Sequence, residues 1–465
     1  MIYTKSSFYV GVIAVVLLMS NFINSSKNEA NDTRINPLIH SQADSLDYFA
    51  DNGFGKPVQS IQHPMGEYFK GVTYVAYQGP HEDPYVCSYN HQTKEWKGPF
   101  KAGISALGKT PLSTDPDEID NHGRPALLVD GEGYIHLIFG GHGGHRGLGA
   151  NTLGTMGRGE QMHVVSKSPY DISEWEQLRN VSPLGTYSQW VKMSNGTIYL
   201  FYRHGSHRSN WVYQKSTDNA RTFAAPVSIL KYKKAEGHAF TSDSWYAWFQ
   251  EGANNSIVST FNYHLCGTGE NHTSLRLNSY YMKMNTETDT WESIMGKKLD
   301  MPLTKESADE LVQIYDSKGK SVRLGTIRSD SKGNPHLYFR NNANISYANW
   351  ESDKWNFNEV LGQKFKFEEA DILIANTNEI RFLTSSIMNN TAEIAWWQAD
   401  ENGKNWTKET PLVTSKNGKY VMSSLIRNAH PDARVIVAEI PNTPMAVDSK
   451  MYLIGDHGPV KRFGF

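Results

Sequence analysis

Two histidines stand at the open end of a predicted β-hairpin whose strands are Arg124–Asp130 and Tyr134–Phe139. His122 and His142 each lie ten residues from Glu132 in the Gly-Glu-Gly turn, so the hairpin should place them side by side. An imidazole exchanges protons near neutral pH, and the glycines around both histidines allow a ligand to approach the backbone closely. The pattern indicates a site for acid–base chemistry, although two solvated loop histidines would explain this one hairpin equally well.

Two further hairpins repeat this construction. In the second, Tyr187 and Arg203 are equidistant from Asn195 and should face each other across the open end. In the third, Tyr246 should fall opposite Asn262. A cation beside a phenol favours the phenolate, and a guanidinium binds carboxylates through its planar fork. Tyr187 is therefore a candidate general base, and Arg203 a candidate carboxylate ligand.

Together these side chains supply what β-elimination on a uronic acid requires. The C5 carboxylate must be neutralised, because neutralisation stabilises the enolate-like intermediate. The C5 proton must be abstracted and the departing O4 protonated. Paired carboxylates, which most glycoside hydrolases use, are scarce at these hairpin ends. The residues favour a lyase over a hydrolase.

A second group of residues is typical of a zinc site. Alternation places His264 and Cys266 on one side of an extended strand, and the loop that follows can return His272 to the same point. A fourth ligand could be His204 or His207, and we favour His207 because it is two loop residues further from the strand that aims Arg203. Four ligands would make the site structural. The alternative is a buried cysteine near unrelated histidines.

Short β-type segments recur along the chain, about seven in number and roughly 60 residues apart. Most follow a Gly, Asn or Ser turn, long amphipathic helical periods are absent, and Asp-box remnants occur at 216–223 and 400–406. This pattern predicts an all-β fold, a seven-bladed β-propeller with four-stranded antiparallel blades. Inner strands of a propeller line one channel, so the three hairpin ends could meet at one face. The last blade should be closed by an N-terminal strand, because too little chain follows Met451–Ile454.

Composition limits the partners. The 465 residues carry a formal net charge of −2, which argues against nucleic acid or an acidic membrane. The 12% aromatic content suits β-structure and stacking on carbohydrate. With only Cys87 and Cys266 the chain is no disulfide scaffold, although one bridge between them stays possible. Cys87 and His91 are expected to be ordinary blade residues.

The N-terminus has the pattern of a secretory signal. Lys5 precedes an apolar run over Phe8–Met19 that is too short for a comfortable transmembrane span. We expect residues 1–26 to be a signal peptide, residues 27–465 to form a single catalytic propeller domain, and the protein to be secreted or periplasmic. A retained N-terminal anchor is the alternative. Oligomeric state cannot be inferred from the sequence.

These motifs together resemble the ulvan lyases of polysaccharide lyase family 25 and, more distantly, those of family 24. The resemblance covers nearly the whole mature chain. Its most specific pieces are 121–125, 140–145, 185–190, 201–207 and 264–266. It implies a seven-bladed propeller that cleaves ulvan, a sulfated algal polysaccharide, between 3-sulfated rhamnose and glucuronic or iduronic acid. Cleavage by β-elimination would leave a 4,5-unsaturated uronic end, and we expect it to be endolytic.

The resemblance also implies roles for single residues. His122 and Tyr187 correspond to the acid/base pair, with Arg203, His142 and Tyr246 binding substrate. Which of the pair accepts and which donates the proton stays open, and Tyr187 alone could do both. The implied ligands of a structural Zn²⁺ are His207, His264, Cys266 and His272.

Two other functions remain compatible with a propeller. A sialidase-like glycosidase would need an arginine cluster on one carboxylate, which Arg203, Arg328 and Arg340 could imitate. A carbohydrate-binding propeller without catalysis would need only the aromatic and basic side chains.

Overall fold

The computed structural model describes residues 45–108, 119–232, 241–267, 275–341, 344–360, 366–376, 379–400, 403–442 and 448–463. All of them belong to one compact unit, Asp44–Phe465. The predicted signal peptide lies outside the described residues. Among the described helices, none is long and apolar enough to cross a membrane.

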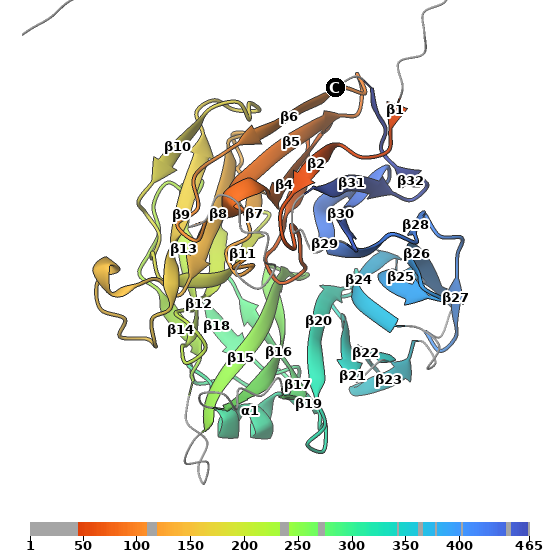
Figure 1. The fold of residues 1–465 in the computed structure, drawn as a ribbon. Helices are drawn as coiled ribbons and strands as arrows, with labels where there is room; N and C mark the ends of the chain where they lie inside the picture. The colour runs from red at the N-terminus through yellow and green to blue at the C-terminus, as the bar shows by residue number, and fades with distance from the viewer. Residues whose placement is uncertain are drawn as a thin grey trace, which may run out of the picture. The chain divides into compact units, whose positions relative to one another are not determined.

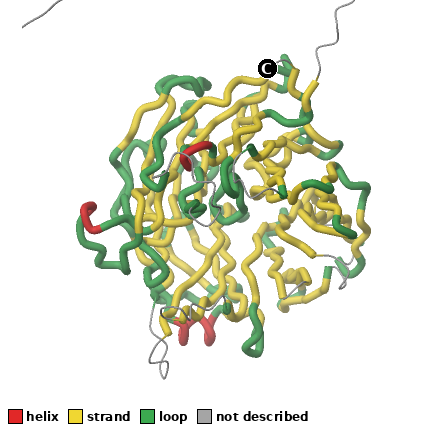
Figure 2. Tube along the Cα trace, in the orientation of Figure 1, coloured by secondary structure: helices red, strands yellow, loops and turns green. Residues whose placement is uncertain are grey.

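Seven four-stranded antiparallel blades make up the described part of the chain (Figures 1 and 2). The strands of the first two blades are β3 (Gly66–Phe69), β4 (Val72–Gln78), β5 (Pro84–Asn90), β6 (Trp96–Lys101); β7 (Ala126–Val129), β8 (Ile135–His142), β9 (Arg158–Ser166) and β10 (Trp175–Leu178). Those of the third and fourth are β11 (Gly185–Lys192), β12 (Ile198–His204), β13 (Trp211–Ser216), β14 (Val227–Leu230); β15 (Thr241–Glu251), β16 (Ser256–Gly267), β17 (Arg276–Asn285) and β18 (Thr290–Glu292).

The remaining three blades follow in chain order. Their strands are β20 (Val322–Ser329), β21 (Pro335–Asn341), β22 (Asn344–Glu351), β23 (Lys354–Glu359); β24 (Lys366–Asn376), β25 (Glu379–Met388), β26 (Thr391–Ala399), β27 (Trp406–Lys408); β29 (Gly418–His430), β30 (Ala433–Pro441), β31 (Ser449–Gly455) and β2 (Ala50–Gly53). Short additions are β1 (Ser45–Leu46), β19 (Gln313–Tyr315), β28 (Val413–Ser415), β32 (Gly458–Pro459), β33 (Arg462–Phe463) and the helix α1 (Lys305–Leu311).

The inner strands close a ring. β3, β7, β11, β15, β20, β24 and β29 each contact the next, and β29 returns to β3. The seventh blade takes its outer strand from the N-terminal side, since β2 pairs with β31 through Ala50 and Met451. The predicted seven-bladed propeller and its closure by an N-terminal strand are both confirmed.

Apolar side chains fill the space between neighbouring blades. Between the third and fourth blades, the rings of Phe201 and Phe249 stack with centroids 4.1 Å apart. The indole of Trp211 donates a hydrogen bond to the Trp245 carbonyl at 2.8 Å. Alternating strand residues send one face into each such layer, because successive side chains of a strand point to opposite sides. The aromatic content of the chain is used mainly here.

One segment before β3 crosses the channel of the ring. The backbone of His63 pairs with Gln189 of β11. Its imidazole stacks on Trp248 with ring centroids 3.6 Å apart and hydrogen bonds to the Phe249 carbonyl at 2.8 Å. Residues 59–61 line one cavity and residues 63–64 line another. The segment therefore divides the channel into two chambers.

Candidate active site

The first hairpin brings His122 and His142 together as predicted. Their imidazole rings stack with centroids 3.7 Å apart and planes inclined by 9°. Two glycines precede His142 at the end of β8. Glycine is needed at Gly141, because a side chain there would collide with the Gly185 carbonyl at the start of β11. The second and third blades thus approach each other closely where the histidines lie.

A buried carboxylate, Asp120, holds both imidazoles. The Nδ1–H of His122 donates to one oxygen at 2.5 Å, and the Nδ1–H of His142 donates to the other at 2.7 Å. Arg158 Nε donates to this second oxygen at 2.5 Å. Burial alone would raise the pKa of Asp120, but the hydrogen bonds from the two histidines hold it well below its usual range. Asp120 is therefore an anion that orients both rings, and it fixes the tautomer of His122 so that the Nε2 of that residue carries a lone pair.

His122 is neutral in this environment. Burial lowers its pKa to about 4, against the opposing effect of Asp120, and nearby His142 and Arg203 lower it further. At neutral pH its Nε2 is thus ready to accept a proton. One third of the His122 side chain is exposed, so a ligand can reach it.

Tyr187 lies beside His122, with ring centroids 5.4 Å apart. The predicted pairing of Tyr187 with Arg203 is wrong by one residue, because Thr186 stands opposite Arg203 and a bulge follows it before Gln189. Tyr187 occupies the bulge with φ +61°, a backbone conformation that tyrosine rarely adopts and that costs about 1–3 kcal/mol. The bulge re-aims the tyrosine towards the histidines.

Arg203 is fully buried beneath two tyrosine rings. Its guanidinium carbon lies 5.0 Å from the ring centre of Tyr187 and 5.8 Å from that of Tyr246. None of its three guanidinium nitrogens has a hydrogen-bond partner among the described residues. Burying a cation without an opposite charge costs free energy. The Arg203 guanidinium therefore has hydrogen-bond donors and a charge available to bind an anion.

Tyr246 forms a pair of neighbouring phenols with Tyr187. It stands opposite Asn262, as predicted, and its ring centroid is 5.6 Å from that of Tyr187. The guanidinium of Arg276 lies 4.2 Å from its ring centre. Burial and the neighbouring Tyr246 raise the pKa of Tyr187, whereas Arg203 and Arg276 lower the pKa of Tyr246 against the effect of burial. Tyr187 therefore keeps its proton, and Tyr246 is the easier of the two phenols to ionise.

A cavity of about 160 Å³ opens beside the two tyrosines. Three arginines and a single carboxylate line it, together with the mostly buried rings of Tyr187, Tyr246 and Trp248. Its charged residues are Arg276, Arg323, Arg340 and Glu369. A chamber of this composition suits an anionic sugar, because arginine forks bind carboxylate and sulfate oxygens.

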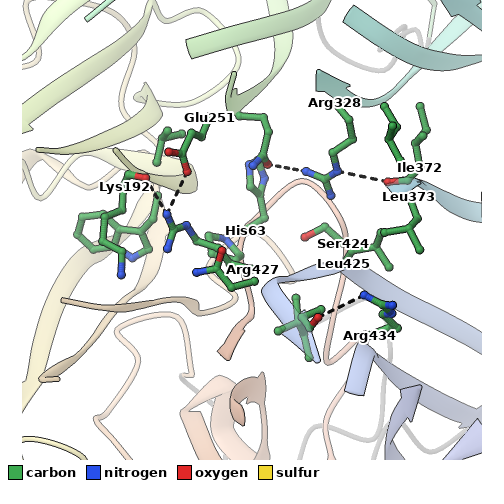
Figure 3. Close-up of a pocket in the computed structure, with 18 of the residues that line it drawn as sticks. His63, Lys192, Glu251, Arg328, Ile372, Leu373, Ser424, Leu425, Arg427 and Arg434 are labelled. Atoms are coloured by element: carbon green, nitrogen blue, oxygen red, sulfur yellow. Dashed lines mark hydrogen bonds and ion pairs between the residues drawn. The ribbon is translucent and has the colours of Figure 1, made fainter. Parts of the chain in front are cut away.

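The second chamber, of about 260 Å³, has a different character. Figure 3 shows Arg427 bound to the Glu251 carboxylate and Arg328 bound to the Ile372 carbonyl. Arg427 donates to Glu251 at 3.0 Å and also binds Glu67 at 2.7 Å. Arg328 donates to Asp371 at 2.6 Å. The Arg427–Glu251 pair joins the seventh and fourth blades across the channel, and the other two pairs join neighbouring blades. Arg328 lines this chamber, whereas Arg340 lines the other. These two side chains therefore do not form the arginine cluster that a sialidase-like site would need.

Of the predicted zinc ligands, His264 lies next to Tyr246, with ring centroids 5.3 Å apart. The rings of His207 and His264 have centroids 5.6 Å apart, and His264 is fully buried. Cys266 follows on β16, but its side chain and His272 lie outside what is described. His204 uses both ring nitrogens in hydrogen bonds, to Ser182 and Asn151. The described members of the donor set, His207 and His264, carry imidazole nitrogens, which are common Zn²⁺ ligands.

Sequence reasoning missed Asp120, Arg158 and Arg276. Asp120 stands only two residues before His122, so the Asp-x-His spacing was a usable signal for an orienting carboxylate. Arg158 and Arg276 begin strands of other hairpins, and their approach to the site depends on packing between strands and blades. Cys87 is buried with a free thiol, as expected for a blade residue.

Comparisons with known proteins agree with this architecture. A family model described as "BNR repeat-containing family member" matches residues 72–411. The chain is 45% identical to an ulvan lyase of Nonlabens ulvanivorans, over 94% of this chain and 92% of that protein. It is 42% identical to "Ulvan Lyase-PL25" of Pseudoalteromonas sp. (strain PLSV), over 91% and 90%. A solved PL25 ulvan lyase bound to -[GlcA(1-4)Rha3S]- superposes with a TM-score of 0.85 at 41% identity, covering 90% of this chain and 98% of that one.

Proposed function

The chain belongs to the ulvan lyases of polysaccharide lyase family 25, a group of BNR-repeat propellers, and from this membership we propose how its site cleaves ulvan. The substrate is a repeat of uronic acid and 3-sulfated rhamnose, the chemistry carried by the fragment on the solved relative. The cut falls between rhamnose and the uronic acid, within the chain. The new end is a 4,5-unsaturated uronic acid.

The observation that carries this proposal is the buried, unpartnered guanidinium of Arg203 under Tyr187 and Tyr246. Its charge favours any anion formed just above it, and elimination forms one when the C5 proton leaves. Because Arg203 is fully enclosed, it meets the substrate carboxylate directly only if a tyrosine ring moves aside. Arg276 at the cavity wall reaches the same region without such a movement.

The protonation states favour His122 as the base and Tyr187 as the acid. Neutral His122 accepts the C5 proton at Nε2, and the electrons of the C5–H bond form the C4=C5 double bond. The C4–O4 bond breaks as this double bond forms, its electrons leave with O4, and Tyr187 donates its proton to O4. A neighbouring uronate raises the pKa of His122, which strengthens it as a base. Asp120 stabilises the imidazolium, and His142 and Tyr246 hold the substrate in position.

Tyr187 could instead perform both transfers. Since Tyr246 is the better site for a negative charge, Tyr187 becomes a base only when its proton passes to Tyr246 or to solvent. The two phenols then titrate as a pair.

Two features of the chain complete the proposal. A zinc ion held by His207, His264, Cys266 and His272 would supply a structural cross-link between the third and fourth blades. It would also support Tyr246, whose ring lies 5.3 Å from that of His264. Residues 1–26 would direct export, because a polysaccharide is met outside the cytoplasm.

The test is digestion of ulvan in water enriched in ¹⁸O, with product masses recorded. Elimination adds no water, so the products carry no ¹⁸O and absorb in the ultraviolet through the conjugated uronate. A glycosidase would place ¹⁸O at the new reducing end. A binding protein would leave the chain length unchanged.

A further inference from the structure

Two histidines and an aspartate meet on the face of the ring opposite the active site. His430 ends β29, Asp432 follows in the turn to β30, and His91 follows β5 of the first blade. The rings of His91 and His430 have centroids 4.1 Å apart. One ligand atom from each of the three residues lies within 4.8 Å of the others.

The position of this cluster follows from β29 and β11. Arg427, three residues before His430, donates to the Lys192 carbonyl at 2.8 Å. Lys192 ends β11, whereas Tyr187 stands near its beginning. The cluster therefore lies at the far end of the inner strands, between the first and seventh blades, and is separate from the substrate site and from His207 and His264.

His91 is oriented as a ligand would be. Its Nε2 hydrogen bonds to the Thr73 hydroxyl at 2.8 Å, and its backbone N–H donates to Gly71 at 2.9 Å. Its Nδ1 is buried and has no hydrogen-bond partner among the described residues. A metal-bound histidine typically directs its other nitrogen to such an outer group. An unsatisfied buried nitrogen costs about 1–3 kcal/mol, which a bound cation would remove.

The charge state also suits a metal. Asp432 contributes a negative charge that opposes the nearby Lys94. The edges of Tyr68 and Tyr89 pack on His91 and restrict its ring.

We propose that His91, His430 and Asp432 bind a divalent transition-metal ion such as Zn²⁺ at the seam between the first and seventh blades. Two imidazoles and one carboxylate form a typical ligand set for Zn²⁺, with water completing the tetrahedron. The ion adds a link between blades that already share a hydrophobic core and pair through Arg427 and Glu67. An ion that binds only the folded chain stabilises the closed ring. The sequence alone had suggested an ordinary blade residue at His91.

The test counts bound zinc. The mature protein is stripped with a chelator, dialysed against ZnCl₂ and analysed by mass spectrometry for metal per chain, with thermal unfolding measured in parallel. The variants are Asp432→Asn, an exposed position, and His430→Ala; the control is Asp353→Asn at another exposed turn. We expect both variants to bind one equivalent less than wild type and to lose the zinc-dependent rise in melting temperature at this site. The control should match wild type.

A third variant tests His91 through its outer contact. Thr73→Val removes the hydroxyl that orients the ring, and we expect about a 10- to 100-fold weaker affinity at this site. Equal zinc content and equal zinc-dependent stabilisation in wild type, Asp432→Asn and His430→Ala would overturn the proposal. If His430→Ala does not fold, Asp432→Asn alone decides.

Discussion

Replacing Asp120 by asparagine tests how the acid–base groups are held. The carboxylate accepts hydrogen bonds from His122, His142 and Arg158 at 2.5–2.7 Å. An amide oxygen can accept from one imidazole, but the amide N–H₂ then faces the other. Asp120→Asn therefore leaves one ring without its acceptor and removes the negative charge that stabilises a protonated His122.

The expected effect follows from the strength of that contact. A hydrogen bond to a charged group contributes about 1.5–3 kcal/mol. If His122 loses this stabilisation in the transition state, kcat falls by about 10- to 150-fold. The carboxylate also raises the pKa of His122 against the effect of burial. Its removal lowers that pKa below about 4, so the acid limb of the kcat/KM profile moves to lower pH.

The assay is initial-rate absorbance of the unsaturated product across a pH series. Asp130→Asn is the matched control, because Asp130 is also buried and contacts a buried histidine, His136, at 3.4 Å near the opposite end of the same hairpin. The control should lower the melting temperature without changing kcat or the pH profile. A folded Asp120→Asn enzyme with wild-type kcat and an unchanged acid limb would refute the role given to Asp120.

Further predictions concern Arg203, the buried histidines and zinc. Arg203→Ala should reduce kcat about 10²- to 10³-fold in the same rate assay, because losing one preorganised electrostatic group has an effect of this size. A loss below tenfold would mean that other groups neutralise the negative charge formed in the elimination. Burial lowers the pKa of His63 and of His163 to about 3, below the unfolded value of 6.5. Their contribution to stability is complete above pH 6.5 and is lost as pH falls towards 3, by up to about 1.4 kcal/mol per pH unit for each group. Melting temperatures between pH 7 and 4 should show this decline, and His63→Gln should flatten it; an equal slope in the variant would exclude His63. Cys266→Ser should lower zinc content and melting temperature while Cys87→Ser leaves zinc content unchanged, and equal zinc in both would remove Cys266 from the ligand set.

The fold was predictable because its signals are local. Short strands separated by turns recur along the chain at the spacing of propeller blades. Counting outward from a turn placed His122 beside His142 and Tyr246 opposite Asn262, since antiparallel pairing fixes the register. These expectations needed no knowledge of neighbouring blades.

The positions of site residues were predictable only where counting residues outward from a turn fixes the strand register. The bulge at Tyr187 shifts the strand register by one residue, and no residue pattern in the sequence predicts this bulge. Arg276 reaches Tyr246 through pairing of β16 with β17, and the segment through His63 crosses the channel between distant blades. Protonation states also depend on burial, which explains why the cation beside Tyr187 does not by itself make that tyrosine the easier phenol to ionise.

The most direct measurement is the absorbance of ulvan with wild type and with Tyr187→Phe, followed over time, with folding and glycan binding checked for both. We predict a rise at the wavelength of the conjugated uronate for wild type and its loss in the variant, because the proton for O4 comes from Tyr187. A rise at the wild-type rate in Tyr187→Phe would contradict that role. No rise with folded, glycan-binding wild type would contradict eliminative cleavage itself.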